Sequence, residues 1–197
     1  MSYFFWKSTH WFSCALCCRY LVVRFDRLRI PMRNEGTAGT AEWHWALGLF
    51  TDGRFEVLGA WRDEGAATAQ RIATDIHDRG VERIKALAGN DSLVAAMEGF
   101  RPKVCRSTVA ELAECSAFGP RMRQAIRWTD AATQQLQNRM QRVIGNQPPF
   151  ADDAAAAEFI AQAFQRADRD LLDDRWGRAR PAPYGASASA AALAAAA

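Results

Sequence analysis

Two aspartates stand near the ends of predicted strands, at positions that suit a metal-dependent phosphoryl-transfer site. Asp26 lies within the segment RYLVVRFDRLRI, and Asp91 follows the segment IKALAGN. Carboxylates that converge from separate elements can hold two Mg²⁺ ions, which then clamp the attacking and leaving oxygens of an in-line displacement. We therefore expect Asp26 and Asp91 to be metal ligands. Such a site also needs a third carboxylate on a later helix, and that ligand is missing.

Each aspartate also has a simpler explanation. Asp26 is surrounded by arginines, among them Arg24 and Arg27, and would then be a charged surface residue of an edge strand. Asp91 precedes a predicted helix and would then be its N-cap, a position where aspartate stabilises a helix by about 1 kcal/mol. The metal site requires the two carboxylates to lie close together, whereas the simpler explanations do not.

The spacing of apolar residues predicts the elements that position these side chains. Alternation and β-branched residues predict a strand at 20–30, ended by Pro31. The pair Asp52-Gly53 predicts a tight hairpin turn between the next two strands. In chain order we expect strands at 20–30, 43–50 and 55–61, a helix at about 65–79, a strand at 83–89, a helix at 92–100, a short strand at 102–106, a helical turn at 109–115, and helices at about 129–144 and 152–176.

This order predicts an α/β fold with a ribonuclease-H-like core. Three antiparallel strands come first, and a helix, a further strand and more helices follow, so a central mixed sheet would be flanked by helices. In that fold the first strand is central and carries one catalytic aspartate, as Asp26 would. A second aspartate belongs at the end of the neighbouring strand, as Asp91 would.

The composition is that of one folded domain with a tail at each end. Of the 197 residues, 49% are hydrophobic, which is enough to form a core. We expect an apolar N-terminal extension at 1–18, the core at 19–176, and a disordered tail rich in Ala, Pro and Ser at 177–197. The extension is too short and too interrupted by polar residues for a membrane span, and it lacks the order of a signal peptide.

Cysteine usage indicates the compartment of the protein, and the distribution of charge indicates the kind of partner. An odd total of five cysteines does not make a disulfide framework, so we expect a cytoplasmic protein. The net charge is only +3, but residues 1–40 and 101–150 are basic and flank an acidic middle. Basic stripes are typical of surfaces that contact a phosphate backbone. A solvated surface of mixed charge explains the pattern equally well.

Four segments, in the same order along the chain, resemble the mutator-type DDE transposases of bacterial insertion sequences. In FDRLRIPMR, Asp26 is followed by apolar residues and Arg33 closes the motif seven positions later. The hairpin ALGLFTDGRFEVLGAW and the passage HDRGVERIKALAGNDS, which carries Asp91, are similar to the next two motifs of that family. PRMRQAIRWTDAATQQLQNRMQRV, followed by PPFADDAAAAEFI, resembles the closing signature. The resemblance covers about Tyr20 to Trp176.

The departures from the family pattern fall on its catalytic parts. Alignment of the closing signature places Gln134 where the family has its catalytic Glu, and an amide cannot neutralise a metal ion as a carboxylate does. Asp130, four residues earlier, is either a substitute carboxylate or the N-cap of the helix after Thr129. Ser107 and Ala110 stand where the family has a Cys and a His. The helical insertion of the family is mostly absent, and no room is left upstream for its separate DNA-binding region.

The resemblance thus implies an enzyme of DNA transposition, which cuts and transfers DNA strands with Mg²⁺, in a catalytically degenerate form. If activity survives, Asp26 and Asp91 hold the metal. The alternative is a non-catalytic remnant that keeps a DNA-binding or self-association surface. The DNA ends of a transposable element, or a second copy of the chain, are the implied partners, with no membrane and no small-molecule cofactor. The arginines expected to contact DNA are Arg33, Arg121, Arg123, Arg127, Arg139 and Arg142.

Overall fold

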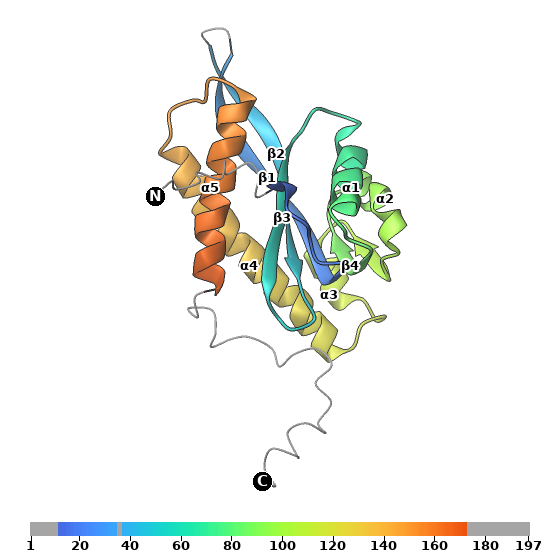
Figure 1. Ribbon diagram of the computed structural model, residues 1–197. Coiled ribbons are helices and arrows are strands. Elements are labelled where there is room, and N and C mark those ends of the chain that lie inside the picture. Colours follow the sequence, from blue (N-terminus) through green and yellow to red (C-terminus); the bar gives the residue numbers. More distant parts are fainter. Residues whose placement is uncertain (1–11, 35–36, 173–197) are drawn as a thin grey trace, which may run out of the picture.

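A mixed five-stranded sheet forms the centre of the protein (Figure 1). The computed structural model describes residues 12–34 and 37–172. The strand order is β3-β2-β1-β4-β5; β2 is antiparallel to β1 and β3, whereas β4 runs parallel to β1 and β5. The strands are β1 (Arg19–Asn34), β2 (Thr37–Leu49), β3 (Phe55–Arg62), β4 (Arg83–Ala88) and β5 (Val104–Arg106). The predicted α/β class and the antiparallel three-strand start are confirmed.

Helices cover both faces of this sheet (Figure 1). Along one face, α1 packs on buried side chains of β1 and β3, and α2 lies beside α1. Along the other face, α4 packs on β1 and β2, and α5 packs on β3 and on α4. The helices are α1 (Thr68–Asp78), α2 (Asp91–Ala96), the 3₁₀ helix η2 (Glu98–Phe100), α3 (Val109–Glu114), α4 (Pro120–Gly145) and α5 (Asp153–Leu172). Burial of one face of each helix follows from the apolar spacing seen in the sequence.

Strand β1 does not end at Pro31 as the sequence predicts. The carbonyl of Pro31 accepts a hydrogen bond from the Phe150 amide at 2.9 Å, and the Arg33 amide donates to the Phe150 carbonyl at 2.8 Å. The N–H and C=O of a strand residue point to the same side, so the missing N–H of Pro31 faces this edge and not β2. The ladder between β1 and β2 therefore loses no hydrogen bond, and the strand continues to Asn34.

Helix α4 begins at Pro120, well before the predicted start near Thr129. Gly119 precedes the helix and Pro120 lies in its first turn, where a missing amide donor costs nothing. Met122 and Ile126 are buried four residues apart, so the apolar face also starts early. Thr129 and Asp130 consequently lie in the helix interior, and the prediction of Asp130 as an N-cap is wrong.

The hairpin between β2 and β3 forms where the sequence predicts it. Gly53 has a φ of 87°, which a glycine adopts without steric cost, and its amide donates to the Phe50 carbonyl at 3.3 Å. The predicted tail at 177–197 and residues 1–11 of the predicted extension lie outside the described residues. Among the helices that are described, none has the length and apolar character that crossing a membrane requires.

Candidate functional site

Asp26 lies on β1 just beyond the point where the neighbouring strand ends. Strand β4 pairs with β1 as far as Arg24, which is opposite Ala88. Two residues later, the Asp26 side chain is partly exposed at the edge that β4 leaves uncovered. One carboxylate oxygen of Asp26 accepts a hydrogen bond from the Arg27 amide at 2.8 Å. The position is the one predicted for the first carboxylate, on the central strand.

Asp91 is the first residue of α2 and follows β4 after two residues. The N-cap of this helix is Asn90, whose side-chain oxygen accepts from the Leu93 amide at 2.9 Å. The simpler prediction, that Asp91 is the N-cap, is therefore wrong. Its carboxylate instead accepts a hydrogen bond from the Ser107 hydroxyl at 2.7 Å, which connects α2 to the segment after β5.

The two aspartates line one open cleft of about 430 Å³ at the end of β4. Its walls come from β1, β2, the β4–α2 connection and the segment after β5. The lining residues are Phe25, Asp26, Arg27, His44, Gly89, Asn90, Asp91, Leu93 and Ser107. The parallel pairing of β1 and β4 ends at Arg24 and Ala88, so the end of β4 lies level with Asp26 in the middle of β1, which is why residues 65 positions apart meet here.

His44 is a buried member of this cleft. It lies 5% exposed on β2 opposite Arg27, and its Nε2 atom is 3.4 Å from an Asp63 carboxylate oxygen. Its Nδ1 atom is buried without a hydrogen-bond partner. Burial lowers the pKa of this imidazole, an effect that the nearby Asp63 carboxylate opposes. His44 is therefore most stable in its neutral form, and its contact with Asp63 orients the ring.

The helix-borne part of the predicted site lies on α4, and Arg24 connects it to Asp26. The guanidinium of Arg24 contacts a carboxylate oxygen of Asp130 and donates to the Asp130 carbonyl at 3.1 Å. Its other terminal nitrogen lies 3.5 Å from a carboxylate oxygen of Asp26. Gln134 is exposed, and its amide nitrogen is 3.4 Å from the second Asp130 oxygen. Gln134 is not among the residues that line the cleft of Asp26 and Asp91.

Sequence reasoning missed the connection between Arg24 and Asp130, which are 106 residues apart. One signal was available, since Arg24 and Asp26 are two residues apart on a strand and so share a face. Burial lowers the pKa of the Arg24 guanidinium, whereas the neighbouring Asp26 carboxylate raises it. The sequence did not indicate that α4 would pack on that same face.

The side chains do not fit a two-metal site. Within the described part of the chain, no three His, Cys, Asp or Glu side chains gather closely enough to hold a metal ion. Asp26 and Asp91 share a cleft, but Asp130 is paired with a guanidinium and Gln134 is an uncharged amide. A pair of Mg²⁺ ions requires more negative charge than the carboxylates of Asp26 and Asp91 supply.

The arginines predicted to contact DNA do not form a single patch. Arg33 lies near the end of the β1–β2 ribbon, whereas the other five lie on α4. Arg127 and Arg139 are 12 residues apart, or about 18 Å along the helix. This spacing divides the five arginines into one group near the start of α4 and another near its end, the first with Arg121, Arg123 and Arg127 and the second with Arg139 and Arg142.

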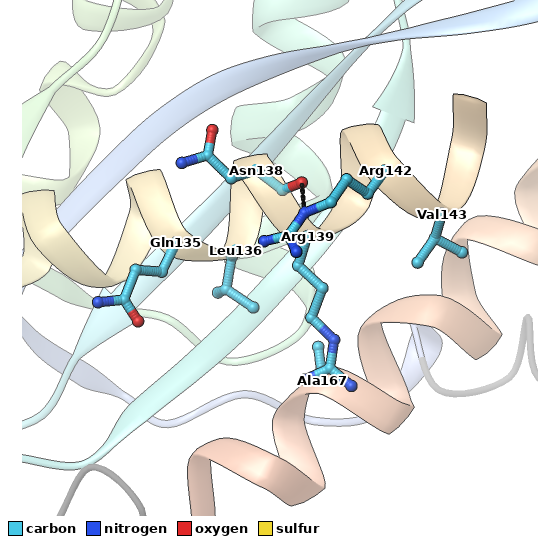
Figure 2. Close-up of a pocket in the computed structure, with 7 residues that line it drawn as sticks. All are labelled: Gln135, Leu136, Asn138, Arg139, Arg142, Val143 and Ala167. Atoms are coloured by element: carbon cyan, nitrogen blue, oxygen red, sulfur yellow. Dashed lines mark hydrogen bonds between the residues drawn. The ribbon is translucent and has the colours of Figure 1, made fainter. Parts of the chain in front are cut away.

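The second group lines a groove of about 490 Å³ between α4 and α5 (Figure 2). Arg139 extends from α4 toward Ala167 of α5, and the Nε of Arg142 donates to the Asn138 carbonyl at 3.4 Å. The described residues that line this groove are Gln135, Leu136, Asn138, Arg139, Arg142, Val143 and Ala167.

Comparison with known proteins confirms the resemblance drawn from the sequence. Residues 8–103, slightly under half of the chain, match the family model "Transposase, Mutator family". A transposase for insertion sequence element ISRM3 from Rhizobium meliloti (strain 1021) is 30% identical over 93 residues, or 46% of this chain. A probable transposase for an ISRM3-like element from Sinorhizobium fredii (strain NBRC 101917 / NGR234) is similar to the same extent. The chain spans only 21% of the length of these two relatives. The family match contains Asp26 and Asp91 and ends before α4.

Proposed function

We propose that this chain, whose residues 8–103 are similar in sequence to Mutator-family transposases, is a catalytic-core segment for DNA transposition with an incomplete acidic site. One observation carries the proposal. Asp26 and Asp91 share a cleft at the end of β4, while the helix position aligned with the third carboxylate holds Gln134. In this form the chain binds DNA and does not cut or transfer strands.

The strand arrangement supports a ribonuclease-H-like core at 19–176. The strand β1 is central, two antiparallel neighbours lie on one side, and the parallel strands β4 and β5 lie on the other. The elements follow the order predicted for that fold, with Asp26 on the central strand and Asp91 after the adjacent one. The short α3 alone stands between β5 and α4. This agrees with the proposed loss of most of the helical insertion.

Loss of catalysis follows from the chemistry at Gln134. A carboxylate contributes a negative charge and oxygen ligands to a divalent cation, whereas a glutamine contributes a single neutral oxygen. Gln134 is already within 3.4 Å of Asp130, and Asp130 is paired with Arg24. Asp130 is therefore a poor substitute for the missing glutamate. Bound Mg²⁺ would stabilise the negative charge on the reacting phosphate. The described residues do not form a complete set of ligands for it.

A strand-cleavage and strand-transfer assay tests the catalytic part of the proposal. The protein is incubated with DNA carrying the ends of an insertion sequence, in Mg²⁺ or Mn²⁺, together with the variants Asp26→Ala and Gln134→Glu. We expect no product from the natural chain or from Asp26→Ala, because the acidic site lacks its third carboxylate. Product that appears with Gln134→Glu would show that this carboxylate alone is lacking. Activity of the natural chain that Asp26→Ala abolishes would contradict the proposal.

DNA contact is the function that we propose to survive. Two of the arginines that we propose to contact phosphates, Arg139 and Arg142, line the groove between α4 and α5. Double mutation of these two arginines to Gln should weaken binding of duplex DNA, measured by fluorescence anisotropy over a salt series. The slope of log affinity against log salt should fall by about 1 for each phosphate contact removed. Arg83→Gln, an exposed arginine at the start of β4, is the matched control and should leave the slope unchanged.

A further inference from the structure

We propose that Arg24 is a built-in cation that occupies the position between Asp26 and Asp130, so that the natural chain does not take up a divalent cation there. Substitution of Arg24 by a neutral residue should open a cation site made of the carboxylate oxygens of Asp26 and Asp130. The inference rests on the proposed function for the assignment of the acidic site, and the contacts of Arg24 are the observations behind it.

The backbone brings the four side chains together from two elements. Arg24 and Asp26 are two residues apart on β1 and point to the same face of the sheet. Asp130 and Gln134 are four residues apart on α4, so they lie on the same side of a helix that packs on that face. Arg24 makes contact with both elements, because its two terminal nitrogens reach the Asp26 and Asp130 carboxylates.

The Arg24 side chain is largely buried and held by its contacts, so its guanidinium acts as a fixed positive charge. It is 16% exposed, compared with 81% for Arg29 on the same strand. A guanidinium has five N–H donors and stays protonated in proteins. It therefore neutralises part of the charge of both carboxylates without an exchangeable ion, and a contact with the Asp130 carbonyl at 3.1 Å holds it in place.

The change in charge predicts that removal of the Arg24 guanidinium strengthens the binding of a divalent cation. The group of four side chains has two carboxylates, one guanidinium and one neutral amide, and thus a formal charge of −1. Without the guanidinium the charge is −2, and the carboxylate oxygens of Asp26 and Asp130 face the vacated position. Divalent Mg²⁺ and Mn²⁺ bind oxygen ligands of this kind. A guanidinium and a divalent cation repel one another, so the two cannot occupy the position between the Asp26 and Asp130 carboxylates together.

Mn²⁺ binding, measured by isothermal titration calorimetry in the absence of DNA, tests this inference. Arg24→Met removes the charge but keeps an unbranched apolar stem, whereas Arg24→Lys keeps the charge. We expect Arg24→Met to bind Mn²⁺ at least tenfold more tightly than the natural chain and Arg24→Lys to show no gain. The gain should disappear in the double variant Arg24→Met/Asp130→Asn. Equal or weaker binding by a folded Arg24→Met would overturn the inference.

The natural chain provides a second measurement if Arg24→Met fails to fold, which circular dichroism and thermal unfolding would reveal. Because Arg24 occupies the position, Asp130→Asn should leave the Mn²⁺ affinity of the natural chain unchanged. A tight Mn²⁺ site that Asp130→Asn removes would overturn the inference. The strand-transfer assay is independent of this result, so failure of the inference and failure of the proposed function are distinguishable.

Discussion

Asp91, beside the strands, and Asp130, on α4, differ in how their carboxylates are held. On the strand side, Asp91 accepts a hydrogen bond from the neutral Ser107 hydroxyl at the open cleft. On the helix side, Asp130 is paired with the Arg24 guanidinium, between the sheet and α4. The strand side lies within the family match, and α4 lies beyond it.

One carboxylate of a site can therefore remain accessible to a ligand while another serves to hold two elements of the fold together. A carboxylate with a neutral partner remains available to a ligand, whereas one that pairs with arginine has its charge already satisfied. We therefore expect substitutions on the helix side to affect stability more than those at the cleft. The following four predictions examine this contrast.

The largest effect should come from the packing that holds α4 on the sheet. Trp45 is fully buried, donates to Gln137 of α4 at 2.9 Å, and has its ring 5.0 Å from that of Phe164 on α5. Trp45→Ala should lower the free energy of unfolding by about 3–5 kcal/mol in urea denaturation. Trp61→Ala, on the partly exposed opposite face, is the matched control and should cost less. Equal losses would show that the two faces do not differ.

Asp130→Asn should have the next largest effect, because it removes the charge that pairs with the partly buried Arg24. We expect a loss of about 1–2 kcal/mol in the free energy of unfolding. A double-mutant cycle with Arg24→Met should show that the two effects are not additive. Additive losses would mean that the contact contributes nothing to stability.

A smaller effect is expected at the start of α2. Asn90→Ala should lower the free energy of unfolding by about 1 kcal/mol, because it removes the acceptor of the Leu93 amide. Asp91→Ala keeps that cap and should be less destabilising. Thermal unfolding of the two variants compares them directly. If Asp91→Ala were the more harmful change, Asp91 would have a structural role and the cleft would not be free to bind.

The smallest effect should be a pH dependence due to His44. Burial lowers its pKa from the ordinary value of 6.5, so protonation favours the unfolded chain. The stability that His44 contributes is complete above about pH 6.5 and is lost as the pH falls through its lowered pKa. His44→Gln should therefore reduce the difference between the urea midpoints at pH 7.5 and pH 5.5. His77→Gln, at an exposed histidine, is the matched substitution for comparison.

Several parts of the fold could be predicted because they depend on local sequence. The hairpin at Asp52-Gly53 follows from turn chemistry, and the helix containing Ile72 and Ile76 follows from apolar spacing. Element ends were less predictable. Pro31 is tolerated because its missing N–H faces away from β2, and its carbonyl contacts Phe150, which comes from a distant segment.

Local sequence alone specified the order of elements, the place of Asp26 within the first strand and that of Asp91 after the fourth, because periodicity and turn residues act over a few neighbouring residues. It also determined that Gln134 is uncharged. The tertiary structure was needed to show that both aspartates line one cleft, that Asn90 and not Asp91 caps α2, and that Arg24 pairs with Asp130. Parallel strand pairing and the seating of α4 on the sheet bring together residues far apart in the chain. Local sequence preferences do not specify such distant contacts.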